Sequence, residues 1–274
     1  MEAWLSDPMV QSSLAPFVVA LIVAVALQPL RLGGLAMAAA FLTTVYFVSG
    51  LTFTPLTATR KIVVLGLAAP VVGILADFAF KPTRVGAALL ALAAAAGALW
   101  AFWPVLAQKP PAEAWTLGAS AAVALAFMVG FGQLFLSADA VRAGAAGLGA
   151  GLATGAAAII SASASYGQYG IALGAGAGAF LLPQMILGKK SAAGATFTLS
   201  AMLLAGLLAA GAMLLAKLPW YALLVLALVP AAARLPVPSL APLWLQAVLL
   251  SLYCFAVGGL ACYVAWPAAG TTTS

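Results

Sequence analysis

The sequence predicts an all-α, polytopic helical membrane protein with about ten transmembrane helices. Hydrophobic residues make up 66% of the 274 residues, and charged residues make up only 6%. The mean hydropathy is +1.18, and a soluble domain of this length needs more polar surface than this composition supplies. Apolar runs long enough to cross a hydrocarbon core of about 30 Å recur along the whole chain.

Ten apolar runs are separated by short segments that carry charged or turn-forming residues. These segments read QPLRLGG, TPLTATRK, KPTR, QKPPAE, SADAVR, SASASYGQ, GKKSAAG, KLP and RLPVPSLAP. The ninth run is short and contains Pro230. The predicted helices cover residues 13–30, 34–53, 62–80, 85–107, 114–136, 143–162, 168–187, 195–216, 219–234 and 242–265.

The distribution of lysine and arginine predicts how the chain lies in the membrane, because basic loops favour the cytoplasmic side. One side collects seven basic residues and the other collects four. This bias places both termini outside the cytoplasm. We expect the protein itself to lie in the cytoplasmic (inner) membrane of a bacterium. A change of one in the number of helices would move the C-terminus to the other side. The seven are Arg31, Lys81, Arg84, Arg142, Lys189, Lys190 and Arg234, and the four are Arg60, Lys61, Lys109 and Lys217.

The chain also carries the signs of an internal repeat. A shift of 129 residues places the first five predicted helices on the last five and Arg60-Lys61 on Lys189-Lys190. An odd number of helices per half gives the halves opposite orientations, so we expect a 5+5 inverted repeat within one membrane domain. Its halves would be residues 1–138 and 139–274. The alternative is chance, because ten similar helices with short loops superpose easily.

The same pattern of glycine and proline lies at the ends of the second and the seventh predicted helices. GLTFTPLTATRK begins at Gly50 and GAFLLPQMILGKK begins at Gly178, and in each a proline follows the glycine by five residues. Backbone groups freed by glycine and proline at corresponding places in two repeats are typical of a transporter's binding site. The alternative is that both prolines only mark helix ends. The candidate solute-binding residues are Tyr46, Ser49, Gly50, Thr52, Thr54 and Pro55 on the second helix and Gly178, Pro183 and Gln184 on the seventh.

Asp77 is the acidic residue that we expect to lie deepest in the membrane, near the end of the third predicted helix. A carboxylate at the bilayer centre costs about 3 kcal/mol on insertion scales, and much less near a helix end. Lys81 lies four residues further on, which is the spacing of a helical ion pair. Asp77 is therefore either an interfacial partner of Lys81 or a proton-coupling group.

Glycines at a spacing of four mark one face of the sixth and of the seventh predicted helices. Such faces let two helix backbones approach closely, so we expect these helices to pack as a tight hairpin. The functional alternative is that smooth faces let helices slide or leave room for a small solute. The glycines are Gly147, Gly151 and Gly155 on the sixth helix and Gly170, Gly174 and Gly178 on the seventh.

Residue types that act in catalysis or bind metals are scarce. The chain has no histidine, five acidic residues and two cysteines. Cys254 and Cys262 share one predicted helix and lie about 12 Å apart along it, too far for a disulfide. We therefore expect no catalytic residue, no cofactor and no metal site, and hence no enzyme. The net charge of +6 is spread over the loops without a basic patch, so we expect no nucleic-acid partner.

These observations favour a small secondary transporter or permease with its site between the two halves, near the second and seventh helices. The alternative is a non-catalytic membrane subunit that anchors or assembles a larger membrane complex. The expected partners are the lipid bilayer and a small solute, with a homodimer or another membrane protein as further possibilities. The sparse charge argues against a multiply charged solute.

Overall fold

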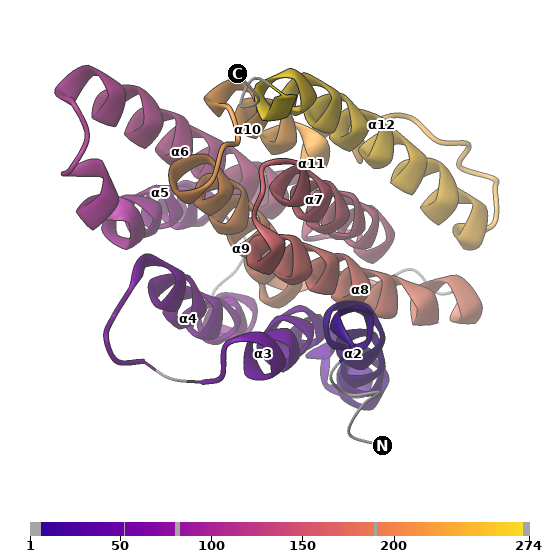
Figure 1. The fold of residues 1–274 in the computed structure, drawn as a ribbon. Coiled ribbons are helices and arrows are strands. Elements are labelled where there is room, and N and C mark those ends of the chain that lie inside the picture. Colours follow the sequence, from indigo (N-terminus) through magenta and orange to yellow (C-terminus); the bar gives the residue numbers. More distant parts are fainter. Residues whose placement is uncertain (1–6, 52, 80–82, 189–190, 271–274) are drawn as a thin grey trace.

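The computed structural model describes residues 7–51, 53–79, 83–188 and 191–270, and every regular element in these ranges is helical (Figure 1). Short π or 3-10 segments are η1 (Val10–Leu14), η2 (Gln28–Leu30), η3 (Gly33–Leu35) and η4 (Gly132–Leu136). The α-helices are α2 (Ala15–Leu27), α3 (Ala36–Val48), α4 (Ala58–Ala79), α5 (Arg84–Leu106), α6 (Pro111–Phe131), α7 (Ala140–Ile160), α8 (Ala164–Leu187), α9 (Gly194–Leu215), α10 (Trp220–Ala227), α11 (Val229–Ala232) and α12 (Leu243–Gly270).

Eight helical segments in the described ranges are long and apolar enough to cross a membrane. This agrees with the predicted polytopic helical membrane protein, and each lies where the sequence predicts a helix. The eight are Val10–Leu30, Ala58–Ala79, Arg84–Leu106, Pro111–Leu136, Ala140–Ile160, Ala164–Leu187, Gly194–Leu215 and Leu243–Pro267.

The second and the ninth predicted spans form shorter helices, so ten full spans are not confirmed. Gly33–Val48 and Trp220–Ala232 are apolar, but at 1.5 Å per residue they are only about 24 and 20 Å long. The first ends before Gly50, whose φ of +68° is incompatible with a helix. The second is divided at Leu228, between α10 and α11, and Pro230 lies in the first turn of α11.

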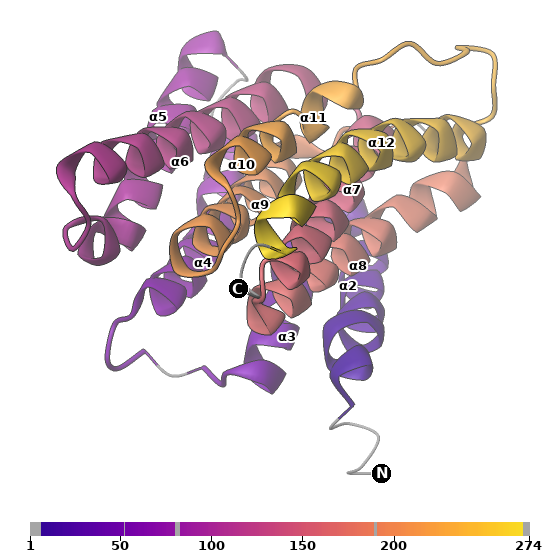
Figure 2. The same ribbon diagram turned by 45° about the horizontal axis from the view of Figure 1, so that its top comes forward.

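Helix α9 forms the centre of the bundle. In its most apolar stretch 94% of the residues are buried, against 33% in α4, α5 and α12. It packs against α4 along its length and also against α5, α6, α7 and α8. Figures 1 and 2 show α5 and α6 on one flank of the bundle and α12 on another. The outer helices therefore present apolar side chains to the surroundings, as lipid contact requires.

The inverted repeat is not confirmed. In such a repeat, α12 would correspond to α6 and α7 to α2. Helix α12 packs along α7, whereas α6 and α2 do not pack along each other in the described ranges. The enclosed α9 would correspond to α4, of whose most apolar stretch only 33% is buried. The division into halves 1–138 and 139–274 stays a prediction.

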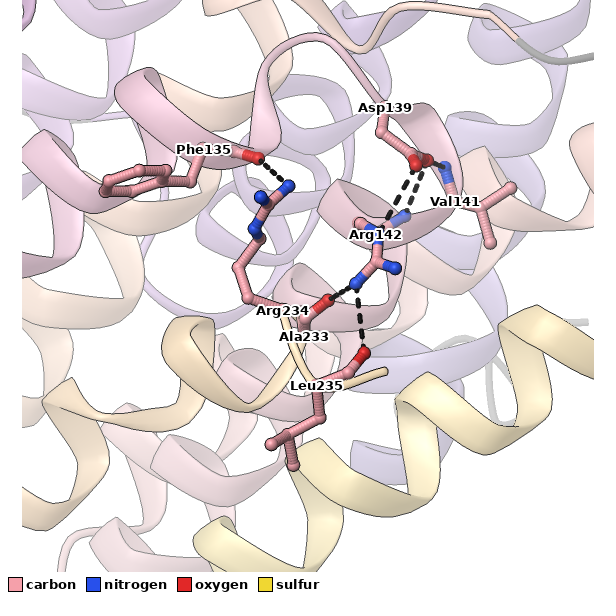
Figure 3. A network of polar contacts seen from close by, with 7 residues as sticks. All are labelled: Phe135, Asp139, Val141, Arg142, Ala233, Arg234 and Leu235. Atoms are coloured by element: carbon pink, nitrogen blue, oxygen red, sulfur yellow. Dashed lines mark hydrogen bonds and ion pairs between the residues drawn. The ribbon is translucent and has the colours of Figure 1, made fainter. Parts of the chain in front are cut away.

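Several loops meet at one end of the bundle, which we call the basic end. The carbonyl of Ser137 accepts hydrogen bonds from the amides of Ala193 and Gly194, at 3.0 and 2.9 Å. The guanidinium of Arg142 donates to the carbonyl of Ala233 at 2.6 Å, so the segment after α11 is tied to the start of α7 (Figure 3). Of the seven basic residues predicted for one side, Arg31, Arg84, Arg142 and Arg234 belong to this end, whereas Lys81, Lys189 and Lys190 lie outside the described residues.

The α11 end is held by two arginines at the basic end (Figure 3). Besides bonding Ala233, Arg142 donates to the carbonyl of Leu235 at 3.2 Å and pairs with Asp139 at 3.5 Å. Arg234 donates to the carbonyl of Phe135 at 3.4 Å and lies over its ring. The last carbonyls of a helix have no intrahelical donor, so these contacts satisfy the backbone where a short helix ends.

The predicted glycine hairpin is confirmed by the packing of α7 on α8. A Cβ atom added at Gly151 would collide with the backbone of Gly174, and one at Gly170 would collide with Gly155. Gly178 differs, because an added Cβ would meet only Leu148 and Phe17 side chains at 3.8 and 4.0 Å. The close approach therefore covers the first part of α8 and opens toward its last two turns.

We expect Gly151→Leu and Gly174→Leu to lower the free energy of unfolding by about 1–3 kcal/mol each, because a side chain at either position forces the two backbones apart. The measurement is thermal unfolding in a mild detergent. Gly259→Leu on α12 is the matched control, since a Cβ added there meets nothing within 4 Å. Wild-type midpoints for both hairpin variants would contradict this account of the packing.

Candidate functional site

A cavity of about 560 Å³ opens at the basic end of the bundle, and we call it the vestibule. Its walls come from the turn between α2 and α3, the last turns of α4 and α8, and the start of α9. Arg31, Ser191 and Ala192 are exposed, whereas Phe180 and Gln184 are buried. The lining residues are Ala24, Gln28, Arg31, Gly33, Gly34, Asp77, Phe78, Phe180, Pro183, Gln184, Ser191, Ala192, Ala193 and Gly194.

The carboxylate of Asp77 caps the first turn of the central helix α9. Its Oδ1 accepts from the amide of Ala195 at 2.6 Å. Its Oδ2 accepts from the amide and the hydroxyl of Thr196, at 2.8 and 2.6 Å. The local N-cap residue of α9, Ala193, has no side chain that can accept. Free amides and the positive end of the helix dipole favour a carboxylate at this place, so Asp77 supplies the cap from another helix.

The predicted ion pair between Asp77 and Lys81 falls outside the described residues, because Lys81 is not among them. The contacts that the structure does give Asp77 join it to Ala195 and Thr196, both more than a hundred positions further along the chain. A role in proton coupling stays a prediction. Gly194 makes the cap possible, since it has a φ of +72° and an added Cβ would collide with the carboxylate of Asp77.

Gln184 brings an amide into the buried wall of the vestibule. The residue is only 4% exposed, and its Oε1 accepts from the hydroxyl of Ser191 at 2.7 Å. The Nε2 of the same amide has no partner among the described residues. The preceding Pro183 cannot donate to the carbonyl four residues earlier, so the backbone of α8 is also weakened here.

Arg31 provides the positive charge of the vestibule. Its backbone is left-handed, with a φ of 60°, and its amide donates to the carbonyl of Gln28 to close the turn after α2. The guanidinium has no hydrogen-bond or ion-pair partner among the described residues. The vestibule therefore holds a cation whose five N–H groups are uncommitted.

The inner end of the vestibule is closed by aromatic packing. The ring of Phe180 stacks on that of Phe197, with centroids 4.1 Å apart. A Cβ atom added at Gly34 would lie only 2.6 Å from the backbone nitrogen of Phe197, so glycine lets the α2–α3 turn approach α9. The polar groups thus lie above an apolar floor.

The structure places the predicted residues of the second helix at the opposite end of the bundle from the vestibule. Ser49 lies near the start of α8, because its hydroxyl accepts from Tyr169 at 3.0 Å. Gly176, further along α8, contacts Ala36 and Ala40 near the start of α3. Helices α3 and α8 are therefore antiparallel. Each candidate motif follows the C-terminal part of its own helix, so the two motifs cannot meet.

Of the nine predicted solute-binding residues, Pro183 and Gln184 line the vestibule, and the possible coupling residue Asp77 lies with them. Tyr46 lines a separate apolar groove on the outside of α2 and α3. Gly178 is half-buried on α8 and outside the vestibule lining. Ser49, Gly50, Thr54 and Pro55 lie at or beyond the end of α3, and Thr52 lies outside the described residues.

Two contacts, each between two hydroxyl groups, lie at the opposite end of the bundle, and we call these two contacts together the hydroxyl pair. Tyr169 donates to Ser49, as described above, and joins α8 to α3. The hydroxyls of Tyr166 and Thr59 lie 3.0 Å apart and join α8 to α4. The tyrosines are adjacent on α8, with rings 6.5 Å apart. Nothing in the local sequence identifies these partners, because each contact joins residues more than a hundred positions apart.

Lys61 is a buried cation near the hydroxyl pair. It is 9% exposed, its ammonium donates to the carbonyl of Trp100 at 3.0 Å, and it lies over the Trp100 ring. Pro104 lies four residues after Trp100 inside α5 and cannot donate to that carbonyl. The lysine thus replaces the missing backbone donor. A proline inside a predicted span was the only signal for this contact in the sequence.

Comparison with protein-family models, curated proteins and solved structures finds no significant match for this chain. The apolar helices make it an integral membrane protein, and the rest of its function is argued from the vestibule, the hydroxyl pair and the outer groove.

We expect Asp77→Ala to lower the free energy of unfolding by about 1–2 kcal/mol, because α9 loses the acceptor for three donors at its start. The free energy of unfolding of Asp77→Asn should lie between those of Asp77→Ala and the wild type, since an amide keeps one acceptor oxygen. Thermal unfolding in detergent measures both. The control is Glu113→Gln, which removes an exposed acid paired with Lys109 at 2.6 Å and should change stability by at most about 0.5 kcal/mol. An equal loss in Asp77→Ala and the control would contradict the capping role.

Proposed function

We propose that the chain is a small secondary transporter or permease of the bacterial cytoplasmic membrane, in which the vestibule is the cytoplasmic entrance to the solute pathway. The observation that carries this proposal is a polar cavity set into the end of an otherwise apolar bundle. The wall of this cavity holds the amide of Gln184 and the exposed Arg31, and polar groups that line a cavity in membrane helices mark substrate pathways.

The pathway would follow α8. This helix runs from the hydroxyl pair at Tyr169 to Gln184 in the vestibule, a distance of about 22 Å at 1.5 Å per residue. One end of it lines the vestibule, and the other is hydrogen-bonded to α3 and α4. Access from one side at a time is what alternating access requires of each state of a transporter.

The side chains along this route suit a movable element. The Phe180–Phe197 stack separates the vestibule from the interior, and Pro183 weakens α8 beside it. The hydroxyl pair consists of neutral hydrogen bonds, each of which contributes only about 0.5–1.5 kcal/mol. These hydrogen bonds therefore add little to the free energy needed to open that end, which is a property expected of a gate. The basic end faces the cytoplasm in this proposal, because basic loops are retained there.

The proposal is tested by thiol accessibility from each side of the membrane. Cys254 and Cys262 are replaced by alanine, and Gln184→Cys is introduced as the probe. An impermeant thiol reagent is applied to right-side-out and to inverted vesicles. We expect Gln184→Cys to react from the basic end and to be protected from the opposite end, since the hydroxyl pair closes that route.

Weakening the hydroxyl pair should then admit the reagent from the opposite end. Ser49→Ala combined with Thr59→Val removes both partners of the tyrosines, and labelling of Gln184→Cys from that end should rise about tenfold for a loss near 1.4 kcal/mol. Thr116→Val is the matched control, because the Thr116 hydroxyl bonds only within its own helix, to the carbonyl of Ala112. Unchanged protection in the double variant, with a normal fold, would rule out a pathway along α8.

A second candidate function is that of a membrane subunit that assembles a larger complex. One observation favours it: an open apolar groove of about 720 Å³ runs along the outer face of α2 and α3. Such a groove suits the side chains of a transmembrane helix of another protein. The groove is lined by Val10, Leu14, Ala15, Val18, Val19, Leu42, Thr43, Tyr46, Phe47 and Leu51.

The second candidate predicts a stoichiometric protein partner in native membranes. After mild solubilisation, native mass spectrometry should find a complex that is lost in Val18→Trp, because a large side chain fills the groove. Leu252→Trp on the exposed face of α12 is the control and should leave the complex intact. Recovery of the wild-type chain alone or as a homodimer would exclude an assembly role.

A further inference from the structure

The vestibule wall contains hydrogen-bond donors that no acceptor among the described residues uses. Asp77 is the acid that lines it, and the oxygens of that carboxylate already accept three hydrogen bonds from the start of α9. The guanidinium of Arg31 and the Nε2 of Gln184 donate to no described residue. A ligand that complements this wall must therefore bring acceptor atoms.

The charge of the vestibule leads to the same chemistry. The Asp77 carboxylate faces the positive end of the α9 dipole, equivalent to about half an elementary charge, which offsets much of its own charge. Arg31 has no such compensation. A single arginine with a free planar guanidinium binds one carboxylate in a bidentate arrangement, which a lysine cannot do. Among the described residues, the vestibule wall thus suits a ligand with one carboxylate group.

The remaining wall is apolar. Ala24, Phe78, Phe180 and Pro183 all line the cavity, and the floor is the Phe180–Phe197 stack. A volume of about 560 Å³ is in the range of pockets that hold small organic molecules. An inorganic anion would leave these apolar surfaces without a partner.

We propose that the vestibule binds a small organic monocarboxylate. Its carboxylate is held by the guanidinium of Arg31 and the Nε2 of Gln184, and its apolar body lies against Phe180 and Pro183. This names the substrate class of the proposed transporter, and as a statement about transport it rests on that function. The binding site itself can be tested without any transport assay.

The test measures binding of benzoate and hexanoate to the purified protein in a neutral detergent by isothermal titration calorimetry, at constant ionic strength. Both should bind, whereas benzamide and benzylamine, which lack the carboxylate, should not. Arg31→Gln should weaken binding at least tenfold, and Gln184→Met should weaken it several-fold. Lys217→Gln removes an exposed cation at the opposite end and should leave the dissociation constant unchanged. Thermal unfolding without ligand verifies that each variant is folded.

Three results would overturn the site. The first is that neither benzoate nor hexanoate binds to the wild-type protein. The second is that benzamide or benzylamine binds as tightly as benzoate. The third is that phosphatidylglycerol binds with a dependence on Arg31 while the carboxylates do not, which would make the vestibule a site for a lipid headgroup.

The binding and the accessibility experiments fail independently. If the carboxylates bind as described but weakening the hydroxyl pair admits no reagent, the site stands and the transport proposal falls. If the reagent is admitted but no carboxylate binds, the transport proposal stands and this substrate class is wrong.

Discussion

The enclosure of α9 is the constraint on which the rest of the fold depends. The first amides of a helix have no intrahelical acceptor, and lipid offers them none. Asp77 provides the acceptors, and it must reach α9 from α4. Gly73, one turn before it, allows this approach, since an added Cβ would lie 2.6 Å from the backbone of Thr196. Asp77, the acid that the sequence predicts to lie deepest in the membrane, thus caps the central helix.

The same rule explains two further charged side chains of the bundle. Lys61 satisfies the carbonyl that Pro104 leaves free, and Arg142 satisfies two carbonyls after α11. In each case the charge replaces a backbone partner that the helix lacks. Arg31 and the Nε2 of Gln184 have no comparable task among the described residues, and both line one cavity. This contrast, rather than their charge or burial alone, distinguishes them from structural groups.

The sequence predicted the helices well because length and hydropathy decide where a chain can cross lipid. It also predicted the α7–α8 packing, since glycines at a spacing of four have one evident use. It could not identify α9 as the central helix, because lipid and protein interior favour the same apolar side chains and leave no amphipathic signal. It also grouped Gly50 and Pro55 with Pro183, although the antiparallel course of α3 and α8 separates them by the length of the bundle. Asp77 lies 118 and 119 residues from its partners Ala195 and Thr196, so their contact could not be predicted from the sequence.

The backbone at Arg31 adds a further argument for a functional arginine. A left-handed conformation costs a residue with a side chain about 1 kcal/mol more than glycine. A turn that only connected α2 to α3 would be more stable with glycine at position 31. A basic side chain kept there for membrane orientation alone would fit equally well at a neighbouring, unstrained position. The strain is accounted for if the arginine is needed at this one position in the wall of the vestibule, where an acceptor-bearing ligand would complete the hydrogen bonds of its guanidinium.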